Sequence, residues 1–239
     1  MKPFLARALA AVALLATGAA LAADPPYPSK PIRIVSPFSA GGGTDLLARM
    51  IQSHLARTTG QSVVVENKPG ANGLLGAEAV AKSPPDGYTL LLGTVGTHGI
   101  NAAMYDKLPY DTRKDFVPVS MVAGAPIMVL AHPSVKANTL QELLAELRRK
   151  PMAYSSAGNG SVGHLAGELF ADVTGVEMIH APYKGAAPAL NDLLAGQVQL
   201  MFGTTASTGQ YVKAGRIKAL GITTAARTPL APDVPTLGE

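Results

Sequence analysis

The sequence predicts an α/β fold built as two lobes. Short apolar runs of the kind found in buried strands alternate with amphipathic stretches typical of helices along most of the 239-residue chain. Near-continuous apolar strands in such an alternation are typical of parallel sheets that helices cover on both faces. The alternation breaks near residues 104–126, where two apolar runs follow one another, and this break indicates a boundary between the lobes.

The first half of the chain supplies three strands and two helices. The predicted strands span residues 32–38, 63–65 and 90–92, and the predicted helices contain residues 46–55 and 74–82. In the first helix, apolar residues share one face: Leu46, Leu47, Met50, Ile51 and Leu55. After the break, the runs 116–122 and 127–131 predict two further strands around a Gly-Ala-Pro turn.

Helix signals are clearest in the second half of the chain. Thr139 and Glu142 form a capping box, and Pro151 follows the helix that they start. Glycines at 175, 196 and 215 mark the ends of the later helices. The predicted strands span residues 152–155, 176–180, 198–202 and 217–223, and the predicted helices span 162–173, 186–195 and 205–214.

The N-terminus is typical of a secretory signal peptide over residues 1–22. Lys2 and Arg7 precede an apolar run over 8–16, and a small-x-small cleavage site ends before Ala23. That run is shorter than the ~20 residues of a membrane span, and no later apolar run is long enough either. We therefore expect export, with no insertion of the mature chain into a membrane.

Charge and composition exclude several classes of protein. The chain has 20 Lys and Arg against 16 Asp and Glu, and loss of Lys2 and Arg7 with the signal peptide leaves a thinly spread excess of two. Nucleic acids and anionic membranes are bound by clustered basic residues, so we expect neither as a partner. The sequence has no Cys, which excludes disulfides, Cys-ligated zinc, iron–sulfur clusters and thiol chemistry.

Two glycine-rich loops each follow a strand and precede a helix, one in each predicted lobe. The first covers residues 39–45 and reads SAGGGTD, and the second covers 156–161 and reads SAGNGS. Backbone N–H groups in such loops, with the partial positive charge of a helix N-terminus, hold an anion without Arg or Lys. In the alternative interpretation the first loop has only a structural role: its glycines form a tight turn, and Thr44 or Asp45 caps the helix.

The second loop also matches the dinucleotide-binding fingerprint at Gly158, Gly160 and Gly163. The acidic residue that would bind a ribose is missing, because the next predicted strand ends at His180-Ala181-Pro182. We therefore predict no nicotinamide, and no other cofactor is expected.

The sequence lacks catalytic and metal-binding patterns. No Ser lies in a Gly-x-Ser-x-Gly motif, and Ser161 with His164 is more typical of a capped helix than of a catalytic pair. The five His residues lack the spacing of metal ligands. The sequence thus predicts neither an enzyme nor a metal site. Before a predicted helix, Tyr183-Lys184-Gly185 either lines a pocket or forms a surface turn.

Several short motifs follow one another along nearly the whole mature chain. They are PFSAGGGTD (37–45), ENKPGA (66–71), PDGYTL (85–90), DFVPV (115–119), SAGNGS (156–161) with HLA (164–166), PYKG (182–185), GQV (196–198) and PT (235–236). With these motifs the chain resembles the Bug family of periplasmic solute-binding proteins, the TctC-type receptors of tripartite tricarboxylate transporters.

The resemblance implies a two-lobed periplasmic binding protein of the Venus-flytrap type (type II-like). Lobe 1 would cover 27–124, lobe 2 would cover 125–218, and residues 219–239 would return to lobe 1. Such a protein is a periplasmic monomer that delivers a small organic carboxylate to membrane permease subunits; the alternative is a receptor for a membrane signalling partner. The ligand-binding residues that the resemblance implies are Phe38, Ser39, Ala40, Gly41, Gly42, Thr44, Asp45, Gly93, Thr94, Thr97, Ser156, Ala157, Asn159, Ser161, His164 and Tyr183.

The sequence departs from the family pattern in two places. Relatives continue with a lobe-completing region after the Pro-Thr motif, whereas this sequence stops at Glu239. We therefore expect an incomplete first lobe, exposed apolar surface there, and reduced stability or weak binding. After Phe202, where many relatives have Asp or Asn, this chain has Gly203, which predicts an altered ligand choice.

Overall fold

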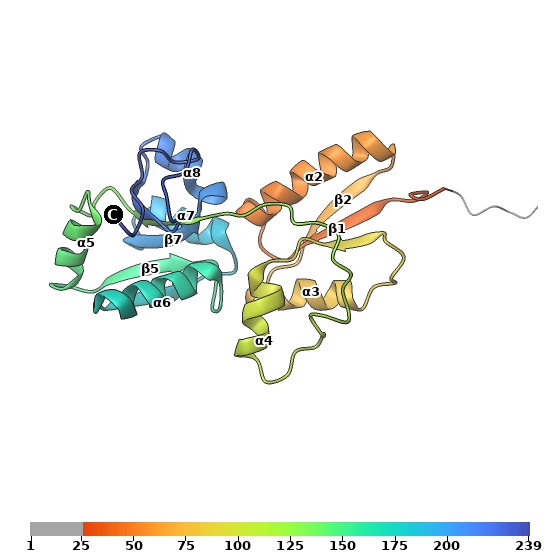
Figure 1. Ribbon diagram of the computed structural model, residues 1–239, viewed down its shortest axis with the longest axis horizontal. Coiled ribbons are helices and arrows are strands. Elements are labelled where there is room, and N and C mark those ends of the chain that lie inside the picture. The colour runs from red at the N-terminus through yellow and green to blue at the C-terminus, as the bar shows by residue number, and fades with distance from the viewer. Residues whose placement is uncertain (1–25) are drawn as a thin grey trace, which may run out of the picture.

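The computed structural model describes residues 26–239, so the predicted signal peptide and its cleavage site lie outside the described residues. The described chain forms two α/β lobes that lie next to each other, and an irregular segment runs from one to the other (Figure 1). Among residues 26–239, no helix is both long enough and apolar enough to cross a membrane.

The first lobe contains a parallel sheet of three strands. Its strands are β1 (Ile32–Ser36), β2 (Val63–Asn67) and β3 (Thr89–Leu91), and its helical segments are α2 (Gly43–Thr59), η1 (Ala71–Gly73), α3 (Leu74–Ala81), η2 (Gly96–Ile100) and α4 (Asn101–Met104). The strand order is β2-β1-β3. Helices α2 and α3 lie on opposite sides of this sheet (Figure 1). The three predicted strands and two predicted helices of this region are all present.

The buried face of α2 differs from the predicted stripe. Ala48 is fully buried in the core of the first lobe, with Leu47 and Ile51 packed against that core. Leu46 and Met50, which belong to the stripe, are 41% and 68% exposed. The small side chain of Ala48 lets the helix backbone approach the sheet, so the contact face is centred on this residue rather than on the larger side chains.

The second lobe contains a mixed sheet of five strands. Its strands are β4 (Ile127–Ala131), β5 (Met152–Ser156), β6 (Met178–Pro182), β7 (Leu200–Thr204) and β8 (Lys218–Ile222), and its helices are α5 (Leu140–Leu147), α6 (Val162–Thr174), α7 (Ala186–Leu194) and α8 (Thr205–Lys213). The strand order is β6-β5-β7-β4-β8. Strand β5 is parallel to β6 and β7, as the alternation predicts, but β4 is antiparallel to both of its neighbours. Strand β4 enters from the other lobe, so it runs in the opposite direction.

Local signals for helix ends correspond closely to the structure. The Thr139 hydroxyl accepts from Glu142 N at 3.1 Å, so the predicted cap of α5 is confirmed. The Glu142 carboxylate accepts from Asn138 N at 2.7 Å, one residue before the position of an ideal capping box. Gly175 ends α6 in the left-handed conformation, as predicted.

The strand predicted over 116–122 is wrong. Residues 116–126 form neither helix nor strand, and the side chains of Val117, Val119 and Met121 are 87%, 83% and 89% exposed. Within residues 26–239, no backbone amide from 116 to 125 donates a hydrogen bond. An apolar run becomes a strand only when another strand pairs with it, and the described chain places none beside this one.

The end of the chain packs on the second lobe. Strand β8 pairs with β4, Leu237 N donates to Ile222 O at 2.9 Å, and Val234 is buried in the cluster that contains Ile222. The C-terminus accordingly lies beside the second lobe (Figure 1). The structure thus keeps residues 219–239 on the second lobe, where the expected division had them return to the first.

Candidate functional site

A cavity of about 520 Å³ opens between the two lobes. The first turns of four helices border it: α2 through Gly43, α6 through Val162, α7 through Ala186 and α8 through Ala206. Apolar side chains from the first lobe and residues 120–125 complete its wall. None of the side chains that line this cavity carries a charge. Any positive potential in it therefore comes from backbone N–H groups and helix N-termini.

A smaller recess of about 260 Å³ lies next to this cavity and shares Phe38, Asn72 and Ala157 with it. Tyr183 and Lys184 also line the recess. The Tyr183 hydroxyl donates to Asp192 Oδ2 at 2.5 Å, and burial together with this bond raises the pKa of Tyr183 to about 12. Its hydroxyl is thus already paired, and the ring serves as a wall.

The N-terminus of α2 has free hydrogen-bond donors. Its N-cap is Gly42, which has no side chain to accept a bond, and the first helical amide with an acceptor is Leu46 N, which donates to Gly42 O at 3.0 Å. Within residues 26–239, the amides of Gly43, Thr44 and Asp45 donate to no protein acceptor. Gly42, Gly43 and Thr44 line the cavity, so a ligand anion there would meet uncapped donors.

The N-termini of α6 and α8 are capped by their own side chains. The Ser161 hydroxyl accepts from His164 N at 3.2 Å, and the Thr204 hydroxyl accepts from Ser207 N at 3.4 Å. Helix α7 resembles α2, because its N-cap is Gly185 and no side chain caps it. The two glycine loops that look alike in the sequence therefore differ at the helix cap: Ser161 caps α6, whereas Gly42 leaves α2 without a side-chain cap.

Asp45 closes the loop before α2 instead of capping the helix. Its carboxylate accepts from Gly41 N at 2.9 Å, Asn67 Nδ2 at 2.9 Å and Arg49 Nε at 3.0 Å, and the residue is only 2% exposed. Burial by itself would raise the pKa of Asp45, but the bonds from Arg49, Gly41 and Asn67 outweigh it and the pKa is lowered. Asp45 thus shapes the loop from outside the cavity.

We expect Asp45→Ala to lower the free energy of unfolding by about 2 kcal/mol, because Gly41 N loses its acceptor inside the protein and Asn67 Nδ2 keeps only Phe38 O. Urea unfolding measures this. The matched control is Asp86→Ala, which removes an exposed pair with Lys30 and the acceptor of Tyr88 N, and which should cost clearly less stability. Equal losses in the two variants would contradict this role of Asp45.

Only some of the predicted ligand-binding residues line the cavity or the smaller recess. The predicted residues that line the larger cavity are Phe38, Gly42, Thr44, Gly93, Thr94, Ala157 and Ser161. Asn159 and Tyr183 line the smaller recess. The predicted residues that line neither are Ser39, Ala40, Gly41, Asp45, Thr97, Ser156 and His164. Thr97 is fully buried and holds the turn at Thr94, since its hydroxyl accepts from Thr94 N at 2.9 Å.

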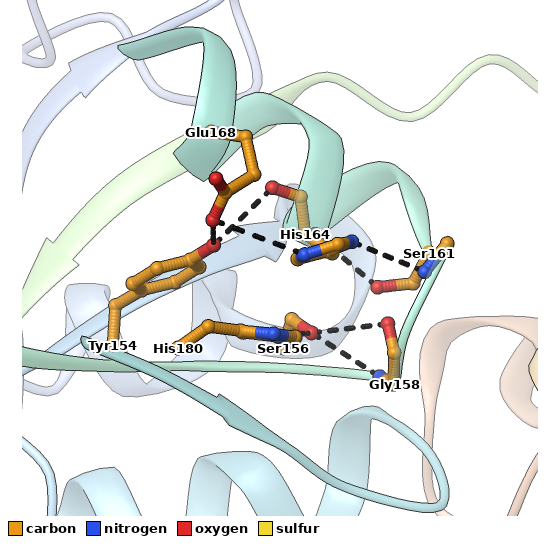
Figure 2. A network of polar contacts seen from close by, with 8 residues as sticks. Tyr154, Ser156, Gly158, Ser161, His164, Glu168 and His180 are labelled. Atoms are coloured by element: carbon orange, nitrogen blue, oxygen red, sulfur yellow. Dashed lines mark hydrogen bonds and ion pairs between the residues drawn. The ribbon is translucent and has the colours of Figure 1, made fainter. Parts of the chain in front are cut away.

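His164 and Ser156 belong to a polar network behind the second loop (Figure 2). The rings of His164 and His180 stack with centroids 4.1 Å apart, and Ser156 Oγ is 2.7 Å from His180 Nε2. At the other end, the Tyr154 hydroxyl donates to Glu168 Oε1 at 2.5 Å. Because these groups pair with one another, the network supports the loop from behind.

This network predicts a loss of stability in acid. Burial, together with the neighbouring His164, lowers the pKa of His180 to about 4, although Glu168 acts against the shift. The unfolded chain therefore binds a proton at His180 between pH 6.5 and pH 4 that the folded chain does not. The lowered pKa corresponds to about 3 kcal/mol, and the partial exposure of His180 reduces this to about 2 kcal/mol of stability, which is lost as the pH drops through this window.

Urea unfolding at pH 7, 6, 5 and 4 measures the effect. His180→Gln should flatten the pH dependence, whereas His54→Gln, on the exposed side of α2, should leave it unchanged. An unaltered slope in His180→Gln would contradict the assignment.

Asn72 is a site residue that the sequence analysis missed. It is buried, lies at the positive φ that Asn tolerates, and donates to Asn101 Oδ1 at 3.0 Å and across the lobes to Gly160 O at 2.8 Å. It directly follows the ENKPGA motif, and Asn-Gly after Pro-Gly is a turn signal that pointed to it. The apolar wall, including Leu47, Leu91 and Leu92, was also missed because such residues are indistinguishable from core.

Two α/β lobes with a cavity between them, bordered by helix N-termini, are the architecture of a periplasmic binding protein. The chain belongs to the TctC family, the tripartite tricarboxylate transporter family receptors, whose family model matches residues 47–239. The resemblance found in the sequence is thereby confirmed.

Individual relatives agree with this assignment. Protein BugT of Bordetella pertussis is 36% identical over 239 residues, and the match covers 98% of this chain and 73% of BugT. The structure of Rpa4515 from R. palustris with adipate superposes with a TM-score of 0.86 at 39% identity, over 89% of this chain and 72% of that one. The structure of MatC (Rpa3494) from Rhodopseudomonas palustris with bound malate superposes with a TM-score of 0.82 at 36% identity, over 88% of this chain and 72% of that one.

Proposed function

We propose that this protein binds a small organic carboxylate between its lobes, in the periplasm, and delivers it to the membrane subunits of a tripartite transporter. One observation carries the proposal: the uncapped N-terminus of α2 opens into a cavity of about 520 Å³ that no charged side chain lines. Such donors bind anions, carboxylates among them, by direct or water-mediated hydrogen bonds, and the adipate and malate of the two R. palustris structures are the reason for proposing a carboxylate.

The polarity of the site favours a ligand with an acidic end and an aliphatic part, because the N-termini of α2 and α7 lie side by side: a β-carbon on Gly42 would be 3.6 Å from Ala186 Cβ. Helices α2 and α7 both begin at a glycine without a side-chain cap, and both border the cavity. Leu47, Met201 and Phe202 add an apolar wall to the same cavity. Adipate and malate, the ligands of the two R. palustris structures, are dicarboxylates. Delivery to permease subunits rests on membership of the family.

A thermal-shift series tests the proposal. Adipate, malate and citrate are compared with the neutral diamide of adipic acid, which keeps the aliphatic chain and loses both charges. We expect at least one carboxylate to raise the melting temperature in a concentration-dependent way and the diamide to have no effect. If no carboxylate shifts the transition, or if the diamide does so equally, the site is not a carboxylate site.

A further inference from the structure

A single hydrogen bond joins the two lobes directly. Asn72 Nδ2 donates to Gly160 O at 2.8 Å, and no other hydrogen bond or ion pair among the described residues links 26–115 to 127–239. The close approach between the starts of α2 and α7 is made by glycine and alanine, without a polar bond. The polar part of the junction between the lobes therefore depends on Asn72.

The loop that carries Asn72 holds its side chain in place. Residues 70–73 all have positive φ, at 135°, 46°, 51° and 81°, a run that costs conformational energy at Ala71 and that Asn72 tolerates. Within the first lobe, Asn72 Nδ2 also donates to Asn101 Oδ1 at 3.0 Å, and Asn101 Nδ2 donates to Asn72 O at 3.2 Å. The local structure thus fixes the amide in the position from which it reaches the other lobe.

The Asn72 side chain has nothing to offer a carboxylate group. One of its amide hydrogens bonds within the first lobe and the other bonds across the junction. Its Oδ1 atom is buried and has no partner in the part of the chain that the structure describes, and a carboxylate has no hydrogen to donate to it. Asn72 therefore acts on a ligand through the lobes and not by contact.

Gly160 is the counterpart of Asn72 on the second lobe. A β-carbon built on Gly160 would overlap Met104 Sδ of α4 and would be 3.3 Å from Asn72 Nδ2. The first lobe thus lies directly against a residue without a side chain. We call this junction the Gly160 contact: Asn72 and Met104 of the first lobe against Gly160 of the second. It requires an amide on one side and glycine on the other.

The Gly160 contact lies where the cavity and the recess meet. Asn72 lines both, as do Phe38 of the first lobe and Ala157 of the second. Separation of the lobes at this point would join the recess to the cavity. A ligand in the cavity is therefore enclosed on this side only while the contact is made.

We propose that the Gly160 contact is the latch that holds the two lobes closed, and that Asn72 is a positioning residue for ligand binding. The proposal rests on the proposed function only for the choice of adipate and malate as probes. Loss of one neutral hydrogen bond shifts the balance between closed and open lobes roughly fivefold and raises the dissociation constant by about that factor. Because the latch does not touch the ligand, adipate and malate should lose the same factor.

Spin labels on one exposed position in each lobe test the latch. The chain has no Cys, so His54→Cys on α2 and Asp172→Cys on α6 supply the labels without background. In ligand-free protein, pulsed electron paramagnetic resonance should give one distance for the parent and a second one in Asn72→Gly, which keeps the positive φ without the amide. Asn138→Gly, which removes a bond to Lys218 within the second lobe, should behave like the parent.

A matched pair of variants tests the contact from the second lobe. Gly160→Ala should open the lobes and weaken adipate binding as Asn72→Gly does, because its β-carbon meets Met104. Adding Met104→Ala should restore most of the closed population and of the affinity. Gly160 has φ 74°, so both proteins carry the same backbone strain at this residue and differ only in the clash across the lobes.

Three results would overturn the proposal. The first is Asn72→Gly with the distances and dissociation constants of the parent. The second is a loss of affinity in Asn72→Gly without a second distance, which would make Asn72 a ligand contact. The third is an equal effect of Gly160→Ala with and without Met104→Ala. If adipate and malate do not bind the parent, the proposed function fails, while the distances in ligand-free protein still decide whether the latch exists.

Discussion

Replacing Gly163 by alanine is expected to lower the free energy of unfolding by about 3 kcal/mol or more, and the melting temperature by roughly 10 °C. A β-carbon at this position would overlap the carbonyl oxygen of Phe202, which is main chain of β7 and cannot rotate away. The start of α6 would have to move off the sheet, and Gly163 lies beside the Ser161 cap of that helix. Differential scanning calorimetry measures the change.

The matched control is Gly209→Ala in α8. Nothing lies within 4 Å of a β-carbon built there, so this substitution adds helix propensity without a clash and should be neutral or stabilising by up to about 1 kcal/mol. If the melting temperature of Gly163→Ala stays within about 2 °C of the parent, α6 and β7 can separate at little cost. That result would contradict the close packing of Gly163 against Phe202 O.

Gly42→Val is expected to lower carboxylate affinity at least tenfold, by about 1.4 kcal/mol or more, while the protein stays folded. Gly42 has φ −80° and ψ 168°, which valine adopts readily, and a β-carbon there makes ordinary contacts with Ser39 O at 3.5 Å and Ala186 Cβ at 3.6 Å. The two γ-methyl groups must then enter the space between α2 and α7, in front of the free amides of α2.

Isothermal titration with the carboxylate that gives the largest thermal shift measures this loss. Gly209→Val serves as the matched control, since it places the same side chain in open space away from the cavity. Unchanged affinity in Gly42→Val would show that the N-terminus of α2 does not hold the ligand, even if the protein binds carboxylates elsewhere. Equal losses in the two variants would point to an indirect effect on folding.

Most of the fold follows from patterns within single elements. Strands such as β1 and β7 are continuous apolar runs, and α5 and α6 have caps in the sequence that the structure confirms at Thr139 and Ser161. Where prediction failed, the missing information came from elsewhere in the chain. The run 116–122 is apolar like a strand, but it contains Pro118, which cannot donate to a ladder, and it has no partner; the direction of β4 depends on its arrival from the other lobe.

The candidate site likewise combines features that the local sequence predicts with features that depend on distant parts of the chain. The glycine loops were correctly placed before helices, but their sequences do not reveal that Ser161 caps one helix while Gly42 leaves the other without a side-chain cap. His164 was expected at the ligand and instead stacks on His180, which lies 16 positions along the chain and on another element. Asp45 was expected either at the ligand or as a helix cap, and it binds Gly41 and Asn67 instead.

The sequence by itself determined the two-lobed α/β class, nearly every helix and strand, and the family, because hydrophobic periodicity, glycine positions and short motifs are properties of neighbouring residues. Only the tertiary structure decided which helix N-termini lack a side-chain cap, which polar groups satisfy one another, and which residues line the cavity. Those properties depend on pairing between residues far apart in the chain. A donor is available only after every other group has found its partner.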